Sequence, residues 1–89
     1  MKKDKVILVT GASSGIGLLI ANRLHNEGFT VFGTSRNPEK HKNKVPFKLL
    51  PLDVTSDHSI RNCIDALMSE VRTIDVLINN AGGLLAGSV

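Results

Sequence analysis

The chain has 89 residues and a formal net charge of +3, with 42% hydrophobic and 21% charged residues. This length allows one small domain or part of a larger one, and the balance of residues is that of a globular protein, so a two-domain enzyme and a disordered or collagen-like chain are excluded. Three Phe without Trp or Tyr cannot easily supply a base-stacking surface, so we predict no nucleic-acid partner.

The first third of the chain predicts a strand, a helix and a second strand. Residues 5–10 form a short β-branched run that ends at a glycine, as is typical of a buried strand. Residues 15–27 predict an amphipathic helix that Gly28 stops. Its apolar positions are Ile16, Leu19, Ile20, Ala21 and Leu24. Residues 30–35 predict the second strand.

The remainder predicts two more strands and another helix. Residues 36–45 are polar and basic, and we expect mainly a loop, although Pro38 could begin a helical turn. Residues 47–52 predict a third strand and residues 75–79 a fourth. Between them, Ser56 or Asp57 can cap a helix. The apolar positions of that helix are Ile60, Ile64, Leu67, Met68 and Val71.

Strands that alternate with helices predict an α/β fold with a parallel sheet and right-handed crossovers. In a Rossmann-like, doubly wound sheet the four strands would lie in the order 3-2-1-4. The third strand would then be an edge, which suits its prolines. The fourth strand is apolar on both faces, yet no further strand follows it in this sequence. We therefore expect either a partner chain along that strand or a polypeptide that has been cut short.

Cysteine and histidine usage limits the compartment and the chemistry. Cys63 is the only cysteine, so no intrachain disulfide can form, and a cytoplasmic location is expected. The strongly apolar run at residues 6–9 is too short for a signal peptide or a membrane span. His25, His41 and His58 lack the spacing of metal ligands, so no metal site is predicted.

A glycine-rich loop joins the first strand to the first helix, with the sequence TGASSGIG at residues 10–17. Its glycines permit a tight turn, a close approach of phosphate to the backbone and close helix packing, while N–H groups at the helix start attract a pyrophosphate. The alternative is a simple strand-to-helix turn, but the flanking strand and helix favour phosphate binding. The candidate residues are Gly11, Ser13, Ser14, Gly15, Ile16 and Gly17.

The chain resembles the short-chain dehydrogenase/reductase family from about residue 5 to its end. The resemblance rests on TGASSGIG at 10–17, a basic residue after the second strand, Leu52-Asp53-Val54, and Asn79-Asn80-Ala81-Gly82. It implies a doubly wound sheet and the NAD(P)-dependent interconversion of carbonyls and alcohols. It also implies that residues 1–89 are the N-terminal part of one dinucleotide-binding domain, and that the full-length protein is a homo-oligomer.

The end of the second strand predicts NADP(H) rather than NAD. An acidic residue there would bind the ribose 2′-hydroxyl of NAD, but no carboxylate occurs before Glu39. Arg36 instead offers a planar charged fork that suits a 2′-phosphate, and by resemblance Ser14 supplies a second contact. The alternative is that Arg36 is an ordinary solvated charge. Lys40, Lys42, Lys44 and Lys48 are interpreted mainly as a solvated face, and the alternative is a general attraction for an anionic cofactor.

Two further strand ends are predicted to line the cofactor cleft. By resemblance, Asp53 accepts a hydrogen bond from the adenine amino group and the Val54 backbone assists it, although Asp53 could instead be a helix N-terminal acid. In the family, Asn79 ties neighbouring strands together and lines the cleft. Ala81 and Gly82 stay small so that the cofactor can lie against the backbone. The alternative for this segment is a strand-ending turn.

No catalytic residue is assigned in this chain. The family uses a Tyr, a Lys four residues later, a Ser and an Asn, all of which lie beyond residue 89, and this sequence contains no Tyr. The 89 residues alone are therefore predicted to be inactive. Three interpretations follow. The first, which we favour, is the N-terminal part of an NADP-dependent oxidoreductase. The second is a complete non-catalytic nucleotide-binding module that pairs through the fourth strand, and the third is a degenerate relative with only a structural or regulatory role.

Overall fold

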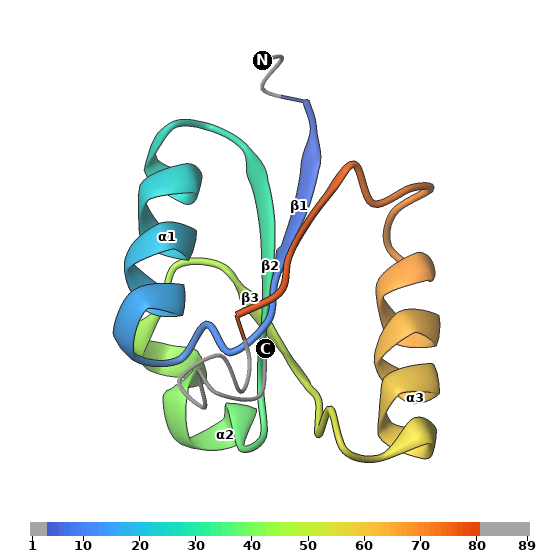
Figure 1. Ribbon diagram of the computed structural model, residues 1–89. Coiled ribbons are helices and arrows are strands. Elements are labelled where there is room, and N and C mark those ends of the chain that lie inside the picture. Colours follow the sequence, from blue (N-terminus) through green and yellow to red (C-terminus); the bar gives the residue numbers. More distant parts are fainter. Residues whose placement is uncertain (1–3, 81–89) are drawn as a thin grey trace.

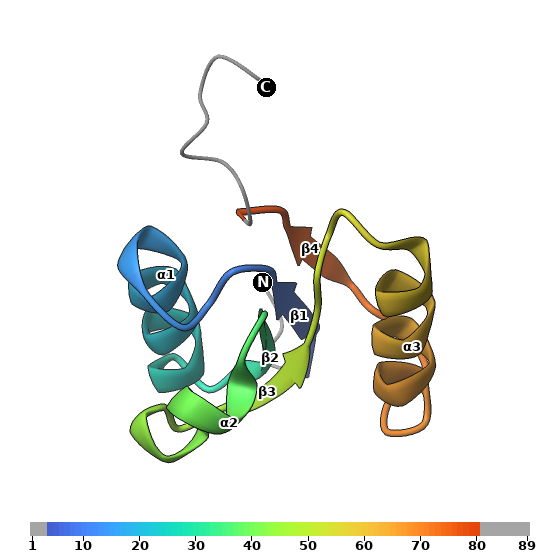
Figure 2. The same ribbon diagram turned by 90° about the horizontal axis from the view of Figure 1, so that it is seen from below.

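A central parallel sheet separates helices on its two faces in the computed structural model, which describes residues 4–80 (Figure 1). The strands are β1 (Val6–Val9), β2 (Thr30–Ser35), β3 (Lys48–Pro51) and β4 (Val76–Ile78), in the spatial order β3-β2-β1-β4. Helix α1 (Gly15–Asn26) and the short α2 (Pro38–His41) cover one face, and α3 (Asp57–Met68) covers the other (Figure 2). The predicted Rossmann-like α/β fold and its 3-2-1-4 strand order are confirmed.

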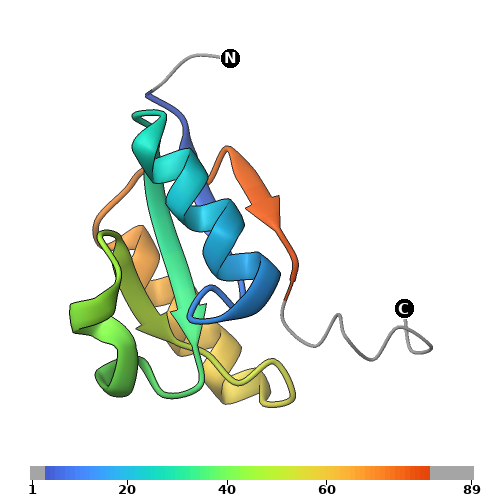
Figure 3. The ribbon, with the colours of Figure 1, turned by 90° about the vertical axis from the view of Figure 1, so that its left-hand side faces the viewer.

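All three ladders of the sheet are parallel. Strand β1 lies in the middle, where Ile7 pairs with Val31 of β2 on one side and with Val76 of β4 on the other. On the far side of β2, Phe32 pairs with Lys48 of β3. The arrowheads of β2 and β4 point the same way in Figure 3. The carboxyl ends of all four strands therefore meet at one edge of the sheet, where open α/β sheets bind their ligands.

Alternate residues of the strands divide the core into two clusters, because successive side chains of a strand point to opposite faces. Ile7 and Val9 belong to the cluster under α1, whereas Leu8 belongs to the cluster under α3. The α3 cluster also holds Cys63, which is 2% exposed. Because helices cover both faces of the sheet, side chains on both faces of a strand are buried. The strand sequences are therefore continuous apolar runs and do not alternate with polar residues.

The predicted apolar face of α1 was partly wrong. The residues of α1 that are fully buried are Gly17 and Ala21, while Ile16 is 60% exposed and Leu19 is 71% exposed. Small residues let the helix approach its neighbours closely, and this rotates positions 16 and 19 outward. The periodicity correctly identified a helix and three of its packing positions, Ile20, Ala21 and Leu24, but it wrongly placed Ile16 and Leu19 on the buried face.

The segment expected to be mainly loop, residues 36–45, is largely helical. Helix α2 is followed directly by a 3₁₀ turn, η1 (Lys42–Lys44). Pro38 stands in the first turn of α2, where its fixed φ favours a helix and its missing N–H costs nothing. Lys42 also pairs with Glu39 at 2.8 Å. These local interactions outweigh the polar composition on which the loop prediction rested.

Strand β4 is the second edge of the sheet. Val76 and Ile78 are half-buried against the α1 cluster, but Leu77 on the opposite face is 60% exposed. Ile60 and Ile64 of α3 are also partly exposed.

At the start of α3, the hydroxyl of Ser56 accepts a hydrogen bond from the backbone N–H of Ser59 at 3.2 Å, so Ser56 is the cap.

Candidate cofactor-binding site

The glycine loop is held against the end of β2. The N–H of Gly11 donates to the hydroxyl of Thr34 at 3.1 Å, and the N–H of Ala12 donates to the carbonyl of Thr34 at 2.9 Å. Gly11 and Gly15 have φ values of 66° and 60°, in the left-handed region that favours glycine. No atom lies within 4 Å of the place a Cβ on Gly15 would occupy. The loop is therefore a fixed turn with an open approach to its backbone.

Gly17 marks a close approach between α1 and two other elements. A Cβ on Gly17 would collide with the carbonyl oxygen of Gly11 and would lie 2.5 Å from the side-chain nitrogen of Asn80. Gly17 thus lets α1 begin against the glycine loop and the end of β4. This is close helix packing, as predicted, but the contacts come from these two segments rather than from the strands themselves.

Asn79 and Asn80 connect the end of β4 to the end of β1. The hydroxyl of Thr10 lies 3.3 Å from the side-chain oxygen of Asn79 and also accepts a hydrogen bond from the N–H of Asn80 at 2.8 Å. The side-chain amide of Asn80 donates to the Gly11 carbonyl at 3.1 Å. Sequence reasoning singled out Asn79 and missed Asn80, whose amide makes the direct contact with the glycine loop.

A cleft of about 570 Å³, most of whose lining residues are polar, opens at the carboxyl edge of the sheet. Four segments line it: the glycine loop, the end of β2, helix α2, and the turn that follows β3. Its lining residues are Gly11, Ser13, Ser14, Thr34, Ser35, Arg36, Asn37, Lys40, His41, Leu52, Asp53, Val54 and Thr55. The cleft thus gathers groups that bind phosphate (hydroxyls, a guanidinium and an ammonium) with one carboxylate that accepts hydrogen bonds.

The structure brings together half of the residues predicted for the site. Those that line the cleft are Gly11, Ser13, Ser14, Arg36, Asp53 and Val54. Gly15, Ile16 and Gly17 belong to the same loop and helix start but do not line it. Asn79 lines a different cavity. Ala81 and Gly82 lie outside the described residues.

Lys40, His41 and Thr55 are lining residues that sequence reasoning missed. Lys40 was grouped with the lysines interpreted mainly as a solvated face. One turn of helix after Pro38 instead brings Lys40 and His41 to the same wall as Arg36. Among residues 4–80, Lys42 pairs with Glu39 and Lys48 pairs with Glu70, whereas no ion pair involves Lys40. The signal that could have found Lys40 is the proline at the helix start.

Asp53 is the only carboxylate among the residues that line the cleft. Its Oδ1 accepts two hydrogen bonds from Thr55, one from the hydroxyl at 2.6 Å and one from the backbone N–H at 3.0 Å. These bonds, the hydroxyl bond first, hold the pKa of Asp53 below its ordinary value, and the positive charge of Arg36 adds to the effect. Asp53 is therefore an anionic acceptor at neutral pH.

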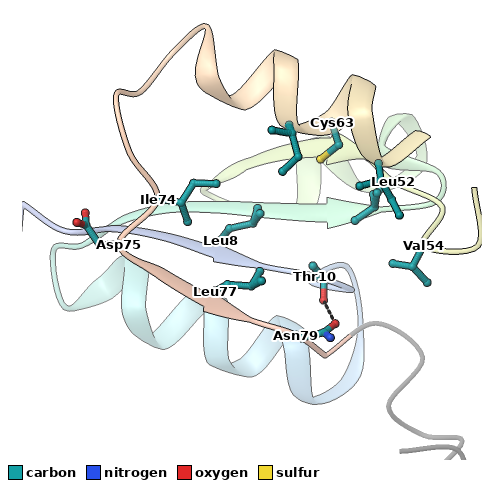
Figure 4. A pocket seen from close by; sticks show the side chains of 11 residues that line it. Leu8, Thr10, Leu52, Val54, Cys63, Ile74, Asp75, Leu77 and Asn79 are labelled. Atoms are coloured by element: carbon teal, nitrogen blue, oxygen red, sulfur yellow. Dashed lines mark hydrogen bonds between the residues drawn. The ribbon is translucent and has the colours of Figure 1, made fainter. Parts of the chain in front are cut away.

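A second cavity, also of about 570 Å³, lies between α3 and β4 and is mainly apolar (Figure 4). Leu8, Ile74 and Leu77 line it beside Cys63, and Thr10 and Asn79 close one end.

Within residues 4–80, no cluster of His, Cys, Asp and Glu could hold a metal ion. No helix in that part of the chain is long and apolar enough to cross a membrane.

Comparison with known proteins identifies the family. The model of the short chain dehydrogenases matches residues 5–89. The chain belongs to this family. A 3-ketodihydrosphingosine reductase of Bacteroides thetaiotaomicron is 44% identical over 87 residues, which cover 98% of this chain and 32% of that protein. The resemblance drawn from the four sequence motifs is confirmed.

Solved structures of the family share the fold. A short-chain dehydrogenase from Streptomyces avermitilis superposes with a TM-score of 0.82 at 38% identity, over 91% of this chain and 32% of that one. RhlG of Pseudomonas aeruginosa, solved as an NADP complex, has a TM-score of 0.74 at 31% identity, over 85% of this chain and 34% of its own. The chain thus spans about a third of the length of these relatives. Because the family is one of oxidoreductases, the comparisons do not favour the alternative of a non-catalytic module.

Proposed function

We propose that this chain is the NADP(H)-binding N-terminal part of an oxidoreductase that interconverts a carbonyl and an alcohol by hydride transfer. The proposal rests on family membership together with one observation, the cationic wall of the cleft. Arg36 and Lys40 line that wall, whereas Glu39, the first carboxylate after β2, is absent from the lining and pairs with Lys42. A wall of this charge attracts a 2′-phosphate and offers no carboxylate to a free 2′-hydroxyl.

The residues of the cleft fit the parts of a dinucleotide. The hydroxyls of Ser13 and Ser14, with the N–H groups at the start of α1, would hold the pyrophosphate. Arg36 and Lys40 would bind the 2′-phosphate, with a further contact from Ser14, which lines the same cleft. Lys40 is an addition to the residues predicted from sequence. When bound, the cofactor supplies or accepts the hydride, and this chain contributes binding and orientation.

The remaining proposed contacts lie at the ends of β3 and β4. Asp53, with the Val54 backbone, would receive the adenine. Asn79, Ala81 and Gly82 would border the cofactor beyond the glycine loop. Residues 1–89 would then form the N-terminal part of a single dinucleotide-binding domain. Its homo-oligomeric assembly and cytoplasmic location stay predictions from the sequence.

A comparison of NADPH and NADH binding tests the proposal. We would titrate the full-length protein with each cofactor and follow nicotinamide fluorescence. We expect NADPH to bind at least about tenfold more tightly than NADH, since one charge-assisted contact is worth about that factor. Arg36→Asp should abolish the preference. Arg72→Asp makes the same charge change at an exposed residue outside the cleft and should keep it.

Two results would contradict the proposal. If NADH binds as tightly as NADPH, or if Arg36→Asp leaves the preference intact, the 2′-phosphate assignment is wrong. If neither cofactor binds to the folded protein, the dinucleotide assignment itself is wrong, and the interpretation as a regulatory relative would replace it.

A further inference from the structure

The turn after β3 holds the carboxylate of Asp53 in one orientation. Both hydrogen bonds from Thr55 go to Oδ1, and among residues 4–80 none is recorded to Oδ2. The backbone at Asp53 is fixed as well: its N–H donates to the hydroxyl of Ser59 at 2.8 Å, and its carbonyl accepts from the N–H of Ser56 at 3.1 Å. The carboxylate therefore has little freedom to turn, and its second oxygen is available to a ligand.

The cleft holds groups that attract phosphate and one group that repels it. The glycine loop and the Arg36–Lys40 wall attract phosphates, whereas the carboxylate of Asp53 repels them and accepts only from a donor. The proposed function places the adenine at the turn formed by Leu52, Asp53, Val54 and Thr55, which lines the same cleft. Under that proposal the base presents its amino group, a donor, to the carboxylate of Asp53.

We propose that Thr55 is a positioning residue which, by bonding Oδ1 of Asp53, aims Oδ2 at position 6 of the purine and makes the cleft select a 6-amino purine over a 6-oxo purine. This inference rests on the proposed function, because it assumes a dinucleotide in the cleft. Beyond the proposed function, the inference assigns a role to Thr55, which acts through Asp53. It also assigns to the cleft a preference for 6-amino purines, which arises because the Asp53 carboxylate is held in one orientation.

The selectivity requires a fixed carboxylate. A 6-amino purine presents a donor at position 6, whereas a 6-oxo purine presents an acceptor there and a donor at the neighbouring N1. A carboxylate that could swing would accept from N1–H of the 6-oxo purine and lose little. A carboxylate pinned by two bonds stays opposite the 6-oxo oxygen and is repelled by it. Sites whose polar groups are locked by supporting hydrogen bonds discriminate in this way.

The test uses the full-length protein and two probes that differ only at position 6. These are NADP⁺ and its deaminated form, nicotinamide hypoxanthine dinucleotide phosphate, with dissociation constants measured by calorimetry. We expect the wild type to prefer NADP⁺ by about tenfold or more. Thr55→Val should reduce the ratio to about threefold or less. Thr55→Ser, which keeps the hydroxyl, should retain it.

A second variant makes an opposite prediction that a merely structural role would not produce. In Asp53→Asn, the Thr55 donors should hold the amide oxygen and turn the NH₂ group toward the base. The preference should then invert in favour of the 6-oxo probe. Adding Thr55→Val to this variant should remove the inversion. Thr30→Val, at an exposed strand position outside the cleft, is the control and should leave the ratio unchanged.

The outcomes separate this inference from the proposed function. If only NAD⁺ binds, the 2′-phosphate assignment fails, and the same comparison with NAD⁺ and its deaminated form still tests Thr55. A wild-type protein that binds both probes equally, or a Thr55→Val protein that keeps the full ratio, overturns the role of Thr55 alone. If no dinucleotide binds at all, both proposals fall.

Discussion

The side-chain amide of Asn80 donates a hydrogen bond of 3.1 Å to the main-chain carbonyl of Gly11, and so ties the end of β4 to the first residue of the glycine loop. The two residues are far apart in the sequence, and Gly17 lies against both of them. The shape of the proposed phosphate-binding loop thus depends on β4, a strand that lies far from the loop in the sequence.

Replacing Asn80 should therefore weaken both the fold and the cleft. Asn80→Ala removes one partly buried hydrogen bond, so the free energy of unfolding should fall by about 1 kcal/mol. Asn80→Asp should cost more, because a carboxylate oxygen would face the Gly11 carbonyl. Urea unfolding of the full-length protein measures both changes. Asn62→Ala, at an exposed position of α3, is the control. An Asn80→Asp protein as stable as the wild type would contradict the contact.

The glycines of the loop should differ in what they tolerate. Gly17→Ala places a methyl group against Gly11 and Asn80, so we expect a loss of about 1–3 kcal/mol, as for other overpacked sites. In Gly15→Ala the added methyl group would contact no other atom, so the loss of stability comes only from the positive φ and should be about 1 kcal/mol. Thermal or urea unfolding gives the order. Equal losses at the two positions would mean that the close approach at Gly17 is relieved at little cost.

Lys40 and Lys42 form a matched pair for the cationic wall. Lys40 lines the cleft, whereas Lys42 pairs with Glu39 and does not line it. Lys40→Ala should weaken NADPH binding by about tenfold and leave NADH binding nearly unchanged, since only NADPH carries the 2′-phosphate. Lys42→Ala should change neither affinity by more than about twofold. Equal effects of the two variants on NADPH would indicate a general attraction of charge instead of a contact.

The titration of Asp53 should report its bonds to Thr55. The ordinary pKa is 3.8, and the hydroxyl and N–H of Thr55 lower it in the folded protein. The stabilising contribution of this carboxylate is therefore present above the unfolded pKa and is lost as the pH falls through the lower folded pKa. In Thr55→Val the midpoint should move up toward the ordinary value. Carboxyl-carbon NMR titration measures this, and an unchanged midpoint would contradict the prediction.

The thiol of Cys63 should be unreactive in the folded protein. The residue is 2% exposed under α3, and burial raises the pKa of its thiol, so little thiolate forms near neutral pH. An aromatic disulfide reagent at pH 8 should label it slowly in buffer and rapidly in urea. Rapid labelling of the native protein would show that α3 separates readily from the sheet.

The sequence was sufficient for the architecture, because strand and helix periodicities and the glycine loop all point to one topology. The bounds of β2 were predicted correctly, and the edge position of β3 followed from the predicted 3-2-1-4 order, with which its prolines agree. What periodicity could not give was the rotation of α1. Ile16 and Leu19 satisfy a helical pattern but are exposed, whereas the small Gly17 and Ala21 are buried and Leu18, Ile20 and Leu24 pack against the core beside them.

The cleft was only partly predictable for a different reason. Its wall depends on one short turn of helix after Pro38, which brings Lys40 beside Arg36. The roles of Thr55 and Asn80 depend on hydrogen bonds whose donors are common in ordinary turns. A sequence motif identifies the residues that a cofactor would touch, whereas the residues that hold those groups in place appear only when the chain is folded.

The central position of β1 has a consequence for how the protein folds during synthesis. One side of β1 pairs with β2 and the other with β4, where Ile7 meets Val76. While the ribosome makes the chain from its N-terminus, β1, α1, β2 and β3 can assemble first, and β1 remains an open edge until β4 emerges. An apolar strand with unpaired backbone groups is a template for aggregation. Synthesis that stalls between β3 and β4 should therefore favour association of nascent chains.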